Sequence, residues 1–151
     1  MLGRAKIDEN VTMTAPTGFT VPAETTGAER LGLKFTVEEE GGMFIEMECL
    51  LTINHSAGGP AEFTLLLDGV DLGVGAVGMG TWDLGTVPDT KHFRHLIQAS
   101  KGEHKLELAL KTAAGNLVLS GASWPSYLTV KRTSHDAVLA QGVNAKSDDI
   151  Y

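Results

Sequence analysis

The chain has 151 residues, of which 42% are hydrophobic and 21% charged, and its formal net charge is −7. This length predicts one domain that can bury enough apolar surface to fold without disulfides or metals. Binding to nucleic acid through phosphates needs a basic face, and the longest run of basic residues is the pair Lys131–Arg132. No stretch reaches the ~20 apolar residues of a membrane span, and the N-terminus lacks the apolar core of a signal peptide. We therefore expect neither nucleic-acid nor membrane binding, and synthesis in the cytoplasm.

Residues 1–29 are rich in Thr, Gly, Pro, Ala and Glu, and their apolar pieces are as short as Val11–Met13 and Phe19–Val21. Pro16 and Pro22 argue against a helix or a central strand in this segment. We predict an extended N-terminal arm that adds one or two edge strands.

Residues 30–132 alternate apolar and polar side chains with the period of two that is typical of strands. The clearest run is Met43–Asn54, and similar runs cover 31–37, 63–67, 93–99, 106–110, 117–120 and 127–131. Residues typical of hairpin turns separate them at 56–60, 68–69, 101–102 and 114–116. About eight short strands at regular spacing predict an all-β, antiparallel jelly-roll sandwich.

Residues 133–151 follow the last predicted strand and form a C-terminal arm. Two interpretations remain open, a disordered tail and an arm that docks on a neighbouring copy or partner. The second interpretation depends on the apolar residues of the arm, which are Val138, Leu139, Val143, Ile150 and Tyr151.

The stretch GVGAVGMG, residues 73–80, contains the letters of the dinucleotide fingerprint G-x-G-x-x-G. That site requires the glycines to join a strand to a helix whose N-terminus holds the pyrophosphate. The residues after Gly78 do not favour a helix, so we predict no nucleotide cofactor. The glycines instead indicate a loop that packs on a neighbouring subunit through Val74, Val77 and Met79, or one short irregular strand.

No group of residues predicts catalysis or a metal site. His92 and His95 are three apart, which places them on opposite faces of a strand, and His104 and His135 have no matching carboxylates. Glu46 and Glu48 share a strand face, but any solvated sheet gives the same pattern. Cys49 lies in an apolar run and is expected to be buried.

The segment Gly102–Leu108, with a turn glycine, His104 and alternating leucines, resembles a strand of TNF-like jelly rolls in tailed-bacteriophage virion proteins. The order of the neighbouring strands is similar over about 31–132. The resemblance implies a non-enzymatic homo-oligomer, usually a trimer, made in the host cytoplasm and located on the virion. Small members with terminal arms look like head decoration (cementing) proteins. Such proteins bind the major capsid protein from outside and reinforce the shell.

An alternative is a carbohydrate- or receptor-binding jelly-roll module of a phage tail or fibre, because jelly rolls often bind glycans. Trp82, Trp124 and Tyr127 could then stack against sugars, if they are exposed.

Overall fold

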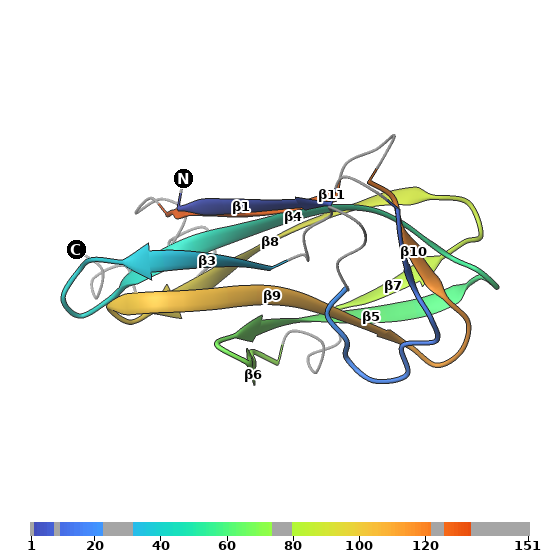
Figure 1. The fold of residues 1–151 in the computed structure, drawn as a ribbon, viewed down its shortest axis with the longest axis horizontal. Coiled ribbons are helices and arrows are strands. Elements are labelled where there is room, and N and C mark those ends of the chain that lie inside the picture. Colours follow the sequence, from blue (N-terminus) through green and yellow to red (C-terminus); the bar gives the residue numbers. More distant parts are fainter. Residues whose placement is uncertain (1, 8–9, 23–31, 74–79, 122–125, 134–151) are drawn as a thin grey trace, which may run out of the picture.

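The computed structural model describes residues 2–7, 10–22, 32–73, 80–121 and 126–133, and all regular elements in these ranges are β-strands (Figure 1). The expected all-β class is therefore confirmed. None of the described segments forms a helix that could cross a bilayer. The predicted interface residues lie outside the described ranges: Val74, Val77, Met79, Val138, Leu139, Val143, Ile150 and Tyr151.

The larger sheet is built on the long strand β4. β8 runs along one side of β4, and β10 and β11 follow one another along its other side, with β2 and β1 outside them. Its strands are β1 (Gly3–Ile7), β2 (Val11–Met13), β4 (Met43–His55), β8 (Asp89–Ala99), β10 (Leu117–Leu119) and β11 (Ser126–Arg132).

The smaller sheet is centred on β9 and β5. β3 pairs with the outer side of β9, and the short strands β6 and β7 pair with the outer side of β5. Its strands are β3 (Gly32–Val37), β5 (Gly59–Leu67), β6 (Val70–Asp71), β7 (Thr81–Leu84) and β9 (Gly102–Thr112).

The order of the strands is that of a jelly roll. The main strands of the larger sheet lie in the order β1, β11, β4, β8, and those of the smaller sheet in the order β3, β9, β5, β7. Every pairing between strands is antiparallel. The chain thus winds through two Greek keys around one core, as the jelly roll requires.

Three of the predicted turns do not close hairpins. The turns at 56–58, 100–101 and 113–116 each carry the chain from one sheet to the other. The Asp68–Gly69 turn does close one, between β5 and β6, and both of its residues have positive φ, of 54° and 82°. Turn chemistry fixes the local reversal of the chain, but not whether the two flanking strands pair.

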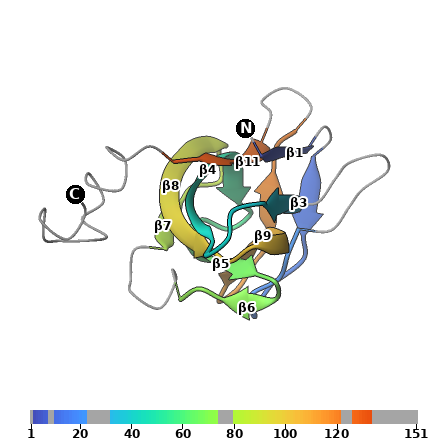
Figure 2. The same cartoon turned by 90° about the vertical axis from the view of Figure 1, so that its left-hand side faces the viewer.

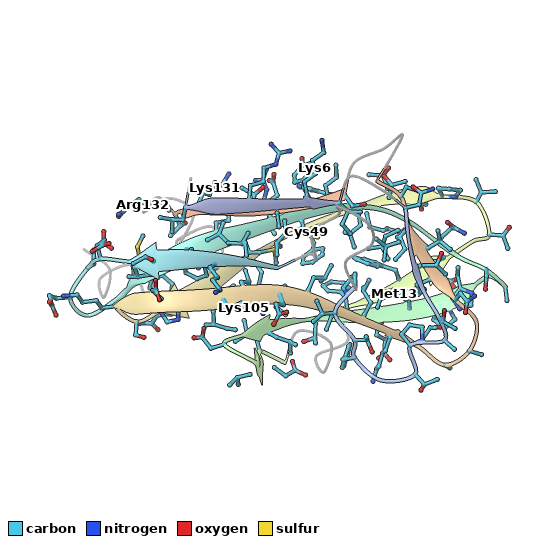
Figure 3. All side chains as sticks on the ribbon, in the orientation of Figure 1. Lys6, Met13, Cys49, Lys105, Lys131 and Arg132 are labelled. Carbon is cyan, nitrogen blue, oxygen red and sulfur yellow. The ribbon has the colours of Figure 1, made fainter. Side chains whose placement is uncertain are left out.

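The core lies between the sheets and is formed by alternate residues. Ile45, Met47, Cys49, Leu51 and Ile53 of β4 are all fully buried, as their spacing predicts. Figure 3 shows Cys49 between the layers, whereas the labelled lysines extend outward. Together the sheets bury one continuous apolar cluster.

The two long sides of the sandwich differ. On one side β1 approaches β3 so closely that a Cβ added at Gly3 would lie 2.9 Å from Leu33 Cδ1. On the other side the edges are β7 and β8, which lie together on the left in Figure 2 and do not pair with one another. Trp82 of β7 and Phe93 of β8 contact each other across this side, with ring centroids 5.8 Å apart, and both are only half-buried.

The N-terminal residues belong to the larger sheet, at the edge away from β8. β1 pairs with β11 and β2 pairs with β10. The chain then crosses to the smaller sheet, where the backbones of Thr20 and Leu110 exchange two hydrogen bonds of 2.9 Å.

Candidate functional site

Three turns meet at one end of the sandwich, the left-hand end in Figure 1, and enclose a hollow. The turns are β3–β4, β5–β6 and β8–β9. The hollow has a volume of about 390 Å³ and is lined by Gly41, Leu67, Asp68, Gln98, Ala99, Ser100 and His104.

His104 fixes one wall of the hollow. Its Nδ1 lies 2.7 Å from Asp68 Oδ2, and its Nε2 lies 2.7 Å from the backbone oxygen of Ser100. A carbonyl and a carboxylate only accept, so both ring nitrogens donate and the ring is an imidazolium. The hydrogen bond with Asp68, followed by that with Ser100, raises the pKa of His104 above its usual value. With both nitrogens engaged, His104 cannot serve as a general base.

Asp68 is held in place from several directions. Its Oδ1 accepts a hydrogen bond of 2.8 Å from the backbone N–H of Lys105, whose carbonyl accepts one of 2.8 Å from Asp68 N–H. The hydrogen bond from His104 and then that from Lys105 lower the pKa of Asp68. The carboxylate therefore stays ionised at neutral pH, and the Asp-Gly turn places it at the rim of the hollow.

The β3–β4 turn reaches this site only because Gly42 has no side chain. A Cβ at Gly42 would lie 2.3 Å from the backbone oxygen of Ala99. Both Gly41 and Gly42 also have φ of +80°, in the left-handed region that favours glycine.

Two polar side chains of the hollow have no protein partner in the described part of the chain. These are the exposed amide of Gln98 and the exposed hydroxyl of Ser100. Together with Asp68 they offer a carboxylate, an amide and a hydroxyl beside the apolar Leu67. This donor and acceptor set suits a neutral polyhydroxyl ligand, because it can both accept and donate several hydrogen bonds.

The outer face of β4 carries Glu46 and Glu48, and both are tied to cations. Arg94 Nε lies 2.8 Å from Glu48 Oε2, His92 Nε2 lies 3.4 Å from the same oxygen, and Lys131 Nζ lies 3.5 Å from Glu46 Oε1. Burial, the largest single influence, raises the pKa of Glu48, but the hydrogen bonds from Arg94 and His92 outweigh it and lower the pKa. A glycosidase acid needs a raised pKa, so Glu48 does not fit that role, and the ion pairs of both carboxylates fit a structural one.

The other titratable groups also have structural surroundings. His92 and His95 lie on opposite faces of β8, as predicted. Over the described ranges, no three His, Cys, Asp or Glu side chains gather as a metal site would require. Cys49 is buried, and burial raises the pKa of its thiol, so the unreactive thiol form persists at neutral pH.

His55, which the sequence pattern does not single out, is buried at the opposite end of the sandwich. Its Nδ1 accepts a hydrogen bond of 3.2 Å from the N–H of Ala57, so Nε2 carries the proton and donates to Thr112 Oγ1 at 3.0 Å. Thr112 Oγ1 in turn donates to the Pro60 carbonyl at 2.9 Å. A Cβ at Gly115 would lie 2.6 Å from His55 Cε1. His55 therefore stabilises the two neighbouring turns that contain Ala57 and Gly115.

The aromatic rings considered as sugar platforms are partly covered. One face of Trp82 stacks on Phe63, with ring centroids 4.3 Å apart. The guanidinium of Arg4 lies 4.4 Å from the ring centroid of Tyr127. Trp124 lies outside the described residues. Neither described ring presents both faces to a ligand.

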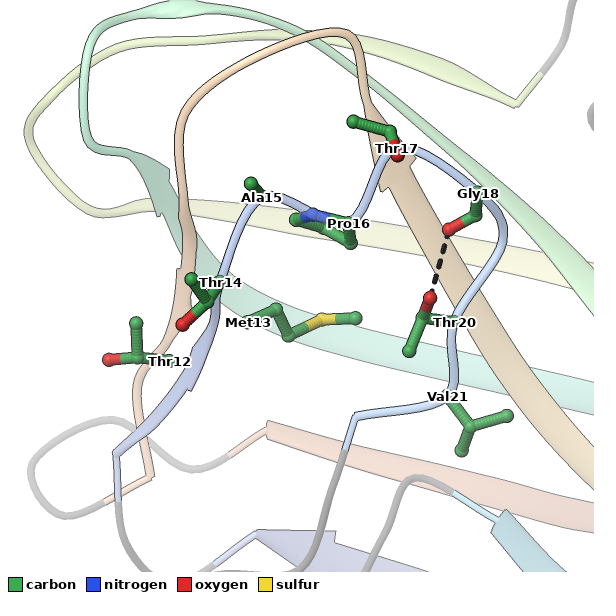
Figure 4. A pocket seen from close by; sticks show the side chains of 9 residues that line it. All are labelled: Thr12, Met13, Thr14, Ala15, Pro16, Thr17, Gly18, Thr20 and Val21. Carbon is green, nitrogen blue, oxygen red and sulfur yellow. Dashed lines mark hydrogen bonds between the residues drawn. The ribbon is translucent and has the colours of Figure 1, made fainter.

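A second hollow, of about 340 Å³, lies within the segment that follows β2 (Figure 4). Four threonines line it, and Thr20 Oγ1 donates a hydrogen bond of 2.9 Å to the Gly18 carbonyl. Figure 4 shows Met13 between the two limbs of the segment. The lining offers hydroxyls but no charged group.

The glycine-rich stretch begins with a side-chain turn and ends in a strand. Asp71 Oδ1 accepts hydrogen bonds from Thr64 Oγ1 at 2.5 Å and from the N–H of Gly73 at 2.7 Å. After Gly80 the chain enters β7, whereas the dinucleotide fingerprint requires a helix. The residues between, 74–79, lie outside the described ranges.

No family model and no curated protein matches the chain. Among solved structures, the sugar-binding C-terminal domain of EclA has 11% identity over 82% of this chain and 78% of that one, with a TM-score of 0.48. Rabbit GITRL has 10% identity over 75% and 79%, with a TM-score of 0.44. A family 36 carbohydrate-binding module, solved with calcium and xylotriose, has 9% identity over 85% and 99%, with a TM-score of 0.40. These likenesses concern the fold only. The chain is an antiparallel jelly-roll β-sandwich.

Proposed function

We propose that this chain is a non-catalytic jelly-roll module that binds carbohydrate in the hollow beside Asp68. The observation that carries the proposal is the fixed Asp68 carboxylate, which shares the hollow with Gln98 and Ser100, whose side chains have no hydrogen-bond partner among the described residues. Sugars present several hydroxyls on a rigid ring, and prepositioned acceptors and donors bind such groups with little ordering cost.

The charged groups around the hollow support binding without catalysis. His104 donates from both nitrogens, and the pKa of Asp68 is lowered rather than raised. Asp68 accepts hydrogen bonds from His104 and from the Lys105 backbone, and both nitrogens of His104 already donate to fixed acceptors, so this pair favours a structural role over proton transfer to a ligand. We expect a bound sugar to be released unchanged.

The test is a glycan array, followed by calorimetric titration of the glycans that bind. Gln98→Ala and Ser100→Ala each remove one exposed polar group that has no partner in the described part of the chain, so the fold should remain intact. Each lost hydrogen bond should weaken binding about 2–13-fold, as a net ~0.5–1.5 kcal/mol implies. The matched control is Thr12→Ala, which removes an exposed hydroxyl from the threonine-lined hollow. If glycan affinity is unchanged in both Gln98→Ala and Ser100→Ala, or if it falls equally in Thr12→Ala, the proposed site is wrong.

A second candidate is the virion role, in which a homo-oligomer, expected to be a trimer, binds the major capsid protein on the outer surface of a phage head. The side of the sandwich formed by β7 and β8 favours this virion role. β8 has 11 residues and pairs only with β4 among the described strands, and Trp82 and Phe93 are half-buried beside it. A long strand edge with apolar neighbours is a template for another chain.

Two measurements separate this candidate from the first. Sedimentation equilibrium gives the mass in solution, for which a trimer is expected, and co-sedimentation with expanded capsid shells gives binding. A monomer that does not co-sediment with the shells would exclude the decoration role. This result would not contradict sugar binding in the hollow.

A further inference from the structure

We infer that the protonation of His104 controls sugar binding in the hollow, because only the doubly protonated ring can hold both the β5–β6 turn and the β8–β9 turn. This control deepens the carbohydrate function proposed above and depends on it. It acts through the backbone of Ser100, whose side chain lines the hollow.

The ring of His104 joins two of the three turns that enclose the hollow. Nδ1 lies 2.7 Å from Asp68 Oδ2 in the β5–β6 turn, and Nε2 lies 2.7 Å from the backbone oxygen of Ser100 in the β8–β9 turn. The side chain of His104 is only 9% exposed, so water has little access to either contact. One imidazolium thus fixes the positions of both turns.

Loss of one proton breaks one of these two contacts. A neutral imidazole has a single N–H, whereas a carboxylate and a carbonyl both only accept hydrogen bonds. The remaining N–H should stay with Asp68, because hydrogen bonds to ionised acceptors are the stronger ones. Nε2 then presents a lone pair to the Ser100 carbonyl oxygen, and two acceptors 2.7 Å apart repel one another. The neutral ring therefore releases the Ser100 carbonyl.

The two candidate sugar-binding side chains of β8 and its turn should respond differently to this release. Ser100 follows the last residue of β8, whose pairing with β4 ends where Ala99 lies opposite Met43. Gln98 lies within this pairing, opposite Phe44, so the ladder between the strands holds it in place. Release of the carbonyl should displace the Ser100 hydroxyl from the hollow and leave the Gln98 amide where it is.

Asp68 supplies the charge that acts on His104. It forms the only ion pair of His104 with a described residue, and on the side of β3 the ring of Phe35 lies 5.5 Å away, between centroids. Other charged side chains of the adjoining strands and turns are exposed or paired elsewhere: Lys34, Glu38, Glu39, Glu40, Lys101, Glu103 and Lys105. The hydrogen bond with Asp68, and then that with Ser100, raise the pKa of His104 above its usual value near 6.5. The Ser100 contact is therefore complete below pH 6.5 and is lost as the pH rises through the raised pKa.

An NMR titration of the free protein from pH 6 to 9 tests the release of the turn without any sugar. The Lys101 amide nitrogen shares a peptide bond with the Ser100 carbonyl, so its signal should shift with the same midpoint as the His104 ring. The amide of Gln98 belongs to the pairing of β4 with β8 and should shift less. A ring that does not titrate in this range, or a Lys101 signal that does not follow it, would overturn the inference.

Calorimetric titration with the glycan that binds most tightly on the array tests the consequence for binding. Wild-type affinity should fall about 2–13-fold between pH 6 and pH 9, which corresponds to one hydrogen bond. Ser100→Ala should lose this pH dependence, because it lacks the hydroxyl that moves. The matched control Gln98→Ala should keep it. His104→Gln should lose it as well, since an amide does not titrate.

The outcomes separate the control by His104 from the sugar function itself. Equal wild-type affinities at the two pH values, or the same pH dependence in Ser100→Ala as in the wild type, would overturn the control and leave sugar binding in the hollow intact. Absence of glycan binding at both pH values would refute the proposed function, and with it the control of that function. The NMR titration would still decide whether His104 holds the Ser100 turn.

Discussion

Gly41 and Gly42 are neighbours in the β3–β4 turn, and both have φ of +80°, yet their surroundings differ. A Cβ at Gly41 would meet nothing within 4 Å, whereas one at Gly42 would lie 2.3 Å from the Ala99 carbonyl oxygen. This pair separates the cost of backbone conformation from the cost of a steric clash. The turn carries one wall of the candidate hollow, so the distinction bears on the site as well as on stability.

We predict that Gly41→Ala lowers the free energy of unfolding by about 1–2 kcal/mol, the cost of a side chain in the left-handed region. Gly42→Ala should add a backbone clash and cost more than about 3 kcal/mol in total. Urea unfolding of both variants checks this. Equal losses would show that the turn moves away from β8 without resistance.

His104 is the residue whose ionisation bears most directly on the hollow. Its folded-state pKa is raised, so its contribution to stability is complete below the unfolded value near 6.5 and is lost as pH rises through the folded value. Asp68 has a lowered pKa, so its contribution is lost as pH falls below about 4 through the folded value. The ion pair is therefore strongest between these limits.

We predict that wild-type stability falls relative to His104→Gln as pH rises from 6 to 9, by about 1 kcal/mol, because Asp68 is half-exposed and the pair is screened. His95 has a lowered pKa and acts in the opposite direction, but both proteins contain it, so it cancels in the difference. Thermal unfolding at a series of pH values is the measurement. A difference that does not change with pH would mean that His104 is uncharged.

At the scale of elements, β10 and β11 act as two halves of one strand that flank β4. A buried hydroxyl joins them, because Ser126 Oγ donates to the Ser120 carbonyl at 2.8 Å and accepts from the N–H of Thr52 at 3.1 Å. Ser120, Thr52 and Ser126 are all buried. One side chain thus replaces the ladder bonds that are lost where the strand is interrupted.

We predict that Ser126→Ala destabilises the fold by about 1–3 kcal/mol, because it leaves a buried donor and a buried acceptor unsatisfied. The control is Thr129→Val on the same strand, a largely buried residue whose hydroxyl makes no hydrogen bond to any described residue. The control should cost less than about 0.5 kcal/mol. Chemical denaturation of the two variants gives the comparison, and a loss as large for Thr129→Val would remove the special role of Ser126.

Most of the strands could be predicted from alternation, and β4 shows why. Along β4, side chains that are buried in the core alternate with side chains on the outer face. The sequence therefore alternates apolar and polar residues with a period of two. β7 was not predicted, because it has four residues, Thr81–Leu84, and only Trp82 and Leu84 face inward. Glycine-containing turns also look alike whether strands pair or cross between sheets. The pairing of the strands could therefore be established only from the structure, which shows the contacts between strands that are distant in the chain.

The candidate hollow was harder to predict for a related reason. Asp68 belongs to a recognisable Asp-Gly turn and His104 to the segment that resembles virion jelly rolls, but they are 36 positions apart in the chain. Gln98 and Ser100 are ordinary polar residues near a turn. The fold alone brings these four together, and no local pattern marks the hydrogen bonds that fix His104.

At the scale of the whole molecule, the described residues form one core cluster that spans both sheets. Among these residues, Leu128 and Val130 of β11 are its members nearest the C-terminus. We therefore predict that removing residues 134–151 changes the free energy of unfolding of the monomer by less than about 1 kcal/mol. If the segment is an arm that docks on a neighbouring copy, the same deletion should weaken self-association. Sedimentation equilibrium and urea unfolding on one preparation measure both effects. Loss of folding would mean that the segment stabilises its own chain, and unchanged association would place the interface elsewhere, so the two measurements distinguish these roles.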